Sequence, residues 1–132
     1  METTINKTFT LTSLKAELRG NVYTPKDAGY LDASKAWNLN AVQRPAVMVM
    51  AETAEDVKLA VLFARDTGMG IGVMATGHGV GVPCGGGLLI NTSKMRGVNV
   101  NPITQTARLE AGALWKDVIP EAAAYGLAGL VG

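Results

Sequence analysis

Hydrophobic and polar residues follow one another in blocks along this chain, and the blocks predict strands and helices in turn. Residues 46–51, AVMVMA, are apolar throughout and predict a buried strand. Thr53 and Asp56 then have the spacing of a capping box, and apolar residues recur at helical spacing until Gly68. A second strand is expected over residues 71–75. Strand, helix and strand in this order are typical of a parallel β-α-β unit.

The segment before this unit is less regular. Ser13 is a candidate N-cap for a short helix, and Gly20 is its expected C-terminal stop. Residues 30–40 then lead into the first strand. We therefore expect an N-terminal helix and lead-in segment over residues 1–40, and the main domain over residues 41–132.

The half of the chain after residue 87 is rich in predicted strands. They are expected over residues 88–91, 97–101 and 106–111. Pro120 lacks a backbone N–H, which predicts a break between a helical turn at 115–118 and a second short helix that Gly126 ends. The expected fold class is α/β (α+β), with the parallel β-α-β unit followed by a mostly antiparallel β region.

A glycine-rich loop follows the second predicted strand and carries the only histidine, His78. Gly77, Gly79 and Gly81 can take positive φ, so successive backbone N–H groups can form a concave nest for phosphate oxygens. The alternative is that these glycines only permit tight turns between strands. The position of the loop at the carboxyl end of a strand favours a nucleotide-type ligand, because ligands bind there in open α/β sheets.

Composition narrows the function classes. With 132 residues, 48% of them hydrophobic, the chain is long enough for one packed domain. A net charge of +1 without runs of like charge gives no sign of a surface that binds nucleic acid or an acidic membrane, although a nearly neutral chain can still hold a local charged patch. No apolar stretch is long enough for a membrane span, and the N-terminus is too polar for a secretory signal. The lone cysteine, Cys84, agrees with a reducing compartment, so a cytoplasmic protein is expected.

Spacing excludes three familiar site types. A dinucleotide fingerprint needs a third glycine, but Val82 stands at that position counted from Gly77, and no helix is predicted to follow the loop. The phosphate loop of nucleoside triphosphatases needs G-K-[ST] after the glycines, and that motif is absent. His78 and Cys84 are too few ligands for a structural zinc centre, so no metal site is predicted.

The cysteine, the tryptophans and an acidic cluster are further candidates for functional residues, and each has a structural explanation. Cys84 is expected to be a small buried or loop thiol, because no redox or triad partner accompanies it. Trp37 and Trp115 are expected to pack amphipathic segments against the sheet. The acidic cluster lies at a helix N-terminus, where the helix dipole favours negative charge. It comprises Glu52, Glu55 and Asp56.

Four motifs in fixed order carry a family resemblance. They are Arg44-Pro45 at a strand start, Gly77-His78 in the loop, NTSKMRGV after the next strand, and AGALWKDV further on. In this order they resemble the FAD-binding domain of the vanillyl-alcohol oxidase and p-cresol methylhydroxylase superfamily, in its berberine-bridge-enzyme-like branch. Upstream, YLDASKAWN is similar to the Tyr, Asp and Trp-Asn pattern of that branch.

The resemblance implies a role for the glycine-rich loop. In this family the backbone N–H groups of the loop hold the FAD pyrophosphate, and the histidine at the place of His78 is commonly bonded to the 8α carbon of the flavin. The alternative for His78 is a non-covalent contact with phosphate or water. The implied cofactor-binding residues are Ala75, Thr76, Gly77, His78, Gly79 and Val80.

Some positions depart from the family pattern. Met74 stands where the family has arginine, and Ala75 and Thr76 stand where it has small or glycine residues, so that Thr76 could add a hydroxyl contact. Cys84 does not match the second flavin attachment site of some members. The apolar ending GLAGLVG leads us to expect that the domain is incomplete at its C-terminus.

Two functional hypotheses follow. In the first, the chain is the FAD-binding portion of a flavin-dependent oxidoreductase that oxidises a small organic alcohol, amine, sugar or natural product. The catalytic base and the substrate site would then lie elsewhere in the full-length protein, and this portion alone would be inactive. In the second, it is a non-catalytic nucleotide-binding module completed by a second polypeptide. An open sheet edge would favour association into a homo-oligomer or poor solubility.

Overall fold

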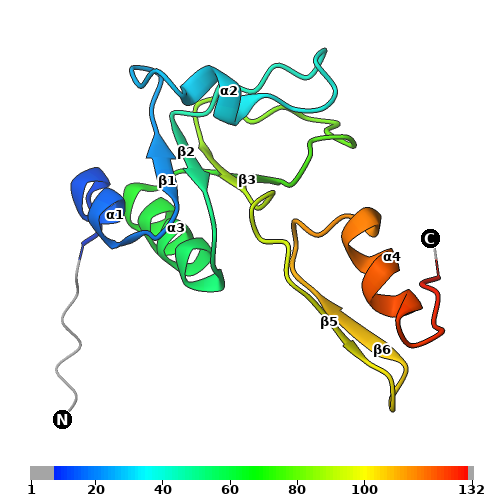
Figure 1. The fold of residues 1–132 in the computed structure, drawn as a ribbon. Helices are drawn as coiled ribbons and strands as arrows, with labels where there is room; N and C mark the ends of the chain where they lie inside the picture. The colour runs from blue at the N-terminus through cyan, green and yellow to red at the C-terminus, as the bar shows by residue number, and fades with distance from the viewer. Residues whose placement is uncertain (1–7, 131–132) are drawn as a thin grey trace, which may run out of the picture.

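The computed structural model describes residues 8–130, which form a sheet with helices on both faces and a separate hairpin that packs against one helix (Figure 1). The elements in chain order are α1 (Leu11–Glu17), β1 (Asn21–Tyr23), α2 (Tyr30–Ser34), β2 (Val47–Met50), α3 (Ala54–Thr67), β3 (Ile71–Met74), β4 (Leu88–Asn91), β5 (Val98–Asn101), β6 (Thr106–Leu109) and α4 (Trp115–Ala123).

The main sheet has the strand order β1-β2-β4-β3. β2, β4 and β3 are parallel, and β1 pairs antiparallel with β2. The expected α/β fold class and parallel β-α-β unit are confirmed. β2 and β3 are nevertheless not neighbours, since β4 lies between them, and the antiparallel region after the loop is limited to the β5-β6 hairpin.

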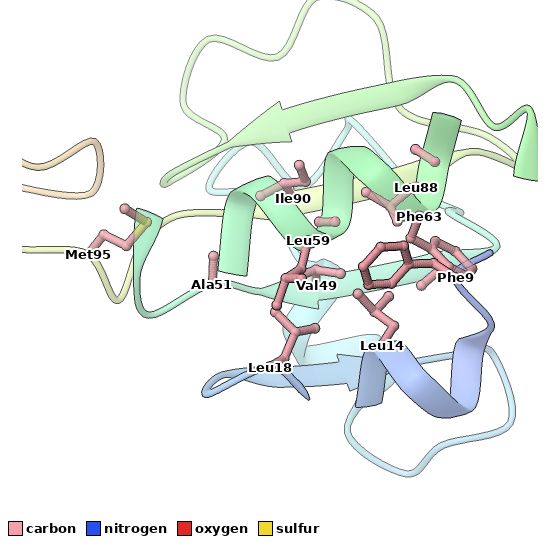
Figure 2. Packing of buried hydrophobic residues seen from close by; sticks show 13 residues of the cluster. Phe9, Leu14, Leu18, Val49, Ala51, Leu59, Phe63, Leu88, Ile90 and Met95 are labelled. Atoms are coloured by element: carbon pink, nitrogen blue, oxygen red, sulfur yellow. The ribbon is translucent and has the colours of Figure 1, made fainter. Parts of the chain in front are cut away.

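Two hydrophobic clusters lie on opposite faces of this sheet, because side chains alternate along each strand. On one face α1 and α3 pack over the strands, as Figure 2 shows. On the other face the lead-in segment packs over Met48, Leu89 and Met74. The buried side chains of the first cluster are Phe9, Leu14, Leu18, Val47, Val49, Ala51, Leu59, Ala60, Phe63, Ala64, Leu88, Ile90 and Met95.

α3 begins and ends where the sequence predicted. Thr53 is its N-cap, and a reciprocal capping box joins Thr53 and Asp56. Gly68 ends the helix in the left-handed conformation, with φ of 68°. The capping box and the C-terminal glycine each depend on residues that are neighbours in sequence, so the sequence pattern alone located both ends of the helix.

α1 begins earlier than predicted. Thr10 is its N-cap, and Ser13 is the third helical residue, which completes a capping box with Thr10. The helix ends at Leu18 in extended conformation, so Gly20 is not its stop. Gly20 instead lies against the backbone carbonyl of Met50, where a Cβ would not fit.

α4 is one helix, and the predicted break at Pro120 is wrong. Proline removes one backbone hydrogen bond, but Val118 and Ala122, one turn apart, are both buried on the face that packs near the β5-β6 hairpin. Gly126 has φ of 67°, and the N–H of Leu127 donates to the carbonyl of Ala122 as in a Schellman motif. Gly126 therefore ends the helix as predicted.

Asp56 ties three parts of the chain together. Its buried carboxylate accepts backbone N–H groups from Arg19 at 2.9 Å, Gly20 at 3.1 Å, Glu52 at 2.8 Å and Thr53 at 3.2 Å. Burial raises the pKa of Asp56, but these backbone hydrogen bonds together lower it more, so the pKa lies below its ordinary value. The acidic cluster thus has a structural role at this residue, as expected.

The boundary between residues 40 and 41 stays a prediction. Residues 1–7 of the first predicted part and residues 131–132 of the second lie outside the described residues. Between residues 8 and 130, no helix has both the length and the apolar character needed to cross a membrane.

Replacing Asp56 with alanine is expected to lower the free energy of unfolding by about 3 kcal/mol, because four backbone N–H groups lose their acceptor. Urea unfolding followed by circular dichroism measures this loss. Glu55→Ala is the control, since the Glu55 carboxylate is exposed and forms an ion pair with Lys58 at the surface, and its effect should stay within about 0.5 kcal/mol.

The contribution of Asp56 should also depend on pH. Because its folded-state pKa is lowered, the stabilisation is present above the unfolded-state pKa and is lost as the pH falls through the folded-state pKa. The stability difference between the wild type and Asp56→Ala should therefore shrink in acid. A difference that stays constant from about pH 7 to about pH 2 would contradict the proposed role.

Candidate functional site

The glycine-rich loop, residues 75–87, connects two parallel neighbouring strands. It leaves the carboxyl end of β3 and returns to the amino end of β4, and no helix forms within it. Parallel strands require such a crossover, and a helix usually makes it. Here Val80 and Cys84 pack against the cluster on the sheet face opposite α3, so the loop crosses that face.

A shallow hollow of about 240 Å³ lies at the start of the loop, lined by residues 73–80. All six predicted cofactor-binding residues line it, so the structure brings them together. Within residues 8–130, the backbone N–H groups of Gly77, Gly79 and Val80 donate no hydrogen bond, whereas the N–H of His78 donates to Thr76 Oγ1 at 3.2 Å. The Thr76 hydroxyl therefore bonds the loop itself.

The three loop glycines differ in their φ angle and in the space available for a side chain. Gly77 has φ of 72°, and a Cβ there would come within 2.5 Å of Ala36 Cβ. Gly79 and Gly81 lack positive φ, and a Cβ at either would meet no atom within 4 Å. Of the three glycines that can take positive φ, only Gly77 does so, and it lies at a close approach to Ala36.

Residues 37–44, which follow α2, hold both ends of the loop. The N–H of Trp37 donates to the carbonyl of Thr76 at 2.7 Å near the start. Near the end, the side chain of Gln43 accepts the N–H of Cys84 at 2.6 Å, and the N–H of Arg44 donates to the Cys84 carbonyl at 2.8 Å. The middle of the loop is left exposed between these anchors.

Tyr30 joins the lead-in segment to the residues just before β2. Its buried hydroxyl donates to the carbonyl of Pro45 at 2.7 Å. Burial raises the pKa of the Tyr30 phenol above its ordinary value. Gln43 was not predicted as a loop anchor, although a polar amide shortly before a buried strand was the available signal.

Trp37 lies beside His78, which the sequence did not predict. The indole is 71% exposed, so the expectation that it packs against the sheet is wrong. Its ring centroid lies 5.0 Å from that of the imidazole, with 47° between the ring planes. Trp115 is also 42% exposed and lines a separate apolar hollow beside α4.

The site suits an anion more than a metal ion. Residues 75–80 contain no carboxylate, and the N–H groups of Gly77, Gly79 and Val80, which have no acceptor among the described residues, are suited to phosphate oxygens. Across residues 8–130, no group of three or more His, Cys, Asp or Glu side chains is arranged to hold a metal ion. Cys84 is a half-buried free thiol, and Met74, where the resemblance led us to look for arginine, is buried in the second cluster.

Comparison with known sequences gives one family and several relatives. The family model described as "FAD binding domain" matches residues 45–131. An FAD-linked oxidoreductase of Dictyostelium discoideum is 32% identical over 73% of the chain and 21% of its own length. The (R)-6-hydroxynicotine oxidase of Paenarthrobacter nicotinovorans is 30% identical over 87% of the chain and 26% of its own length.

Solved structures agree with these matches. The crystal structure of 6-hydroxy-D-nicotine oxidase from Arthrobacter nicotinovorans superimposes with a TM-score of 0.79 at 29% identity, over 94% of this chain and 27% of that one. BBE-like 1 from Physcomitrella patens has a TM-score of 0.66 at 26% identity, over 79% of this chain and 23% of that one. The chain thus spans about a quarter of the length of the relatives it matches.

Gly77→Ala and Gly79→Ala form a matched pair that tests the loop geometry. Gly77→Ala is expected to lower the free energy of unfolding by about 2 kcal/mol, because it adds a side chain at positive φ and against Ala36. Gly79→Ala should change it by less than about 0.5 kcal/mol, since the added Cβ meets no atom. Equal losses in urea unfolding of the two variants would refute this assignment.

Proposed function

This chain belongs to the FAD binding domain family, and we propose that its glycine-rich loop holds the pyrophosphate of FAD in a flavin-dependent oxidoreductase. The resemblance to the vanillyl-alcohol oxidase and p-cresol methylhydroxylase superfamily, in its berberine-bridge-enzyme-like branch, is confirmed by the family match and by the solved relatives. FAD is accordingly the cofactor of the family to which this chain belongs.

One observation carries the assignment of the pyrophosphate to the loop. The N–H groups of Gly77, Gly79 and Val80 have no acceptor among the described residues, and the glycines beside the hollow leave room for a ligand to approach the backbone. A pyrophosphate supplies negatively charged oxygen acceptors of the kind that such N–H groups bind. Ala75 and Thr76 would line the same cradle, with Thr76 holding the turn through its hydroxyl.

The exposed imidazole of His78 is the proposed covalent attachment point. FAD, when bound, would supply the redox chemistry and an electrophilic 8α methyl group. Attachment would replace a methyl C–H bond and the imidazole N–H bond by a C–N bond, with the two hydrogens and their electrons retained by the flavin until an oxidant such as O₂ removes them. The contribution of the chain is to hold the imidazole at the rim of the hollow.

The proposed activity of the full-length protein is oxidation of a small organic alcohol, amine, sugar or natural product, with FAD as hydride acceptor. Support comes from the names of the relatives, which are oxidoreductases and include an oxidase of (R)-6-hydroxynicotine. Because the chain spans about a quarter of these relatives, we propose that substrate binding and the catalytic base belong to residues outside it. By itself this portion would not turn over substrate. A cytoplasmic location agrees with its single cysteine.

Oligomerisation is also proposed. β3 is an edge strand of the main sheet, and its side chains Ile71 and Val73 are 45% and 66% exposed. An exposed apolar edge strand favours association with another chain.

Gly79→Ala is expected to weaken FAD binding by about tenfold while the unfolding midpoint stays unchanged, because the added Cβ fills the space proposed for the pyrophosphate. Titration of FAD fluorescence with the purified chain measures the affinity. Gly85→Ala, at a glycine of the same loop with equally open surroundings but outside the hollow, is the control and should bind like the wild type. Equal affinity of Gly79→Ala and wild type would place the pyrophosphate elsewhere.

His78→Ala is expected to abolish covalent flavin while non-covalent FAD binding persists, because the backbone donors remain. The wild type and the variant are incubated with FAD in air, denatured, and examined for fluorescence that stays with the polypeptide. Covalent flavin on His78→Ala would show that the attachment residue is not His78. A wild type that binds FAD without retaining it after denaturation would support the non-covalent alternative.

A further inference from the structure

Trp37 lies outside the residues matched by the family model, yet it contacts the proposed attachment residue. The family match begins at residue 45, whereas the indole and imidazole rings of Trp37 and His78 are 5.0 Å apart between centroids. That separation and the 47° tilt fall within the range of favourable aromatic pairs. The lead-in segment therefore contributes a side chain directly to the site.

The backbone of Trp37 is held beside the loop. The N–H of Trp37 donates to the Thr76 carbonyl at 2.7 Å, and the preceding residue, Ala36, is buried against Gly77. Trp37 is thus anchored to the two residues that immediately precede His78. A large apolar side chain that is 71% exposed has little packing elsewhere to account for its place.

His78 has few other restraints on its ring. Its backbone N–H is held by Thr76 Oγ1, but within residues 8–130 its imidazole forms no hydrogen bond or ion pair. Val80 is half-buried against the second hydrophobic cluster, and Gly77 and Gly79 carry no side chain that could restrict the imidazole. Among the described residues, the Trp37 indole is the ring that lies against the imidazole.

We propose that Trp37 is a positioning residue, which holds the His78 imidazole at the rim of the hollow in the orientation needed for flavin attachment. The inference rests on the proposed function of His78. Restricting a nucleophile to reactive orientations raises the rate of bond formation without a matching change in ligand affinity. Loss of the indole should therefore slow attachment while leaving FAD binding largely intact.

The first experiment needs no flavin. His78 is the only histidine, so its two ring C–H proton signals are identified by NMR without ambiguity. The ring current of Trp37 should displace these signals from the positions of a free histidine. Trp37→Leu should return them, and Trp37→Phe should retain part of the displacement. Trp115→Phe, in α4, is the control and should leave them unchanged. Signals that Trp37→Leu does not move would overturn the proposal.

The second experiment measures attachment. At saturating FAD in air, Trp37→Leu should bind flavin covalently about tenfold more slowly than the wild type, with the non-covalent dissociation constant within about threefold. Trp37→Phe should recover most of the rate. A purely structural role would instead lower the affinity and the unfolding midpoint of Trp37→Leu together with the rate. Equal attachment rates in the wild type and Trp37→Leu, or a loss of rate explained by weaker binding, would overturn the positioning role.

The two failures can be told apart. A wild type that binds no FAD contradicts the proposed function, and the ring signals of His78 then still decide whether Trp37 orients the imidazole. A wild type that attaches flavin at the same rate as Trp37→Leu leaves the proposed function in place and removes only the role of Trp37.

Discussion

The placement of β4 between β2 and β3 is the constraint on which the rest of the structure depends. Since these strands are parallel, each connection has to return from the carboxyl end of one strand to the amino end of the next. α3 covers one face, and the glycine-rich loop crosses the other without a helix. A crossover without helical hydrogen bonds leaves backbone N–H groups free near the carboxyl end of β3, where ligands bind in open α/β sheets.

A loop of this kind has to be held in place by other segments, and residues 36–44 do this. Gly77 allows the backbone of Ala36 to approach closely, and the Gln43 side chain bonds the far end of the loop at Cys84. The middle, around Gly81, remains exposed. Anchored ends and an open centre are typical of binding loops on a rigid scaffold. The family match and the shape of the solved relatives are consistent with this arrangement.

Signals that act within a few residues were predictable. The capping box at Thr53, the left-handed stop at Gly68 and the apolar run of β2 were all located from the pattern, because each depends on neighbouring residues in the chain. Where two neighbouring residues could play the same role, or a local signal opposed the packing, the sequence did not predict the outcome. Ser13 looked like an N-cap, but Thr10 caps the helix and Ser13 completes the box, since both residues have side chains suited to that role. Pro120 looked like a break, but burial of one helix face outweighed the lost hydrogen bond.

The sequence by itself determined the fold class, the family resemblance and the loop that carries His78, because motif order and hydrophobic period are properties of the chain. Tertiary structure alone decided the position of β4 between its parallel neighbours, since strands far apart in sequence pair through backbone groups that every residue carries. It also placed Trp37 beside His78. Forty residues of intervening chain separate the two rings, and the contact of Ala36 with Gly77 together with the hydrogen bond from Trp37 to Thr76 brings them together.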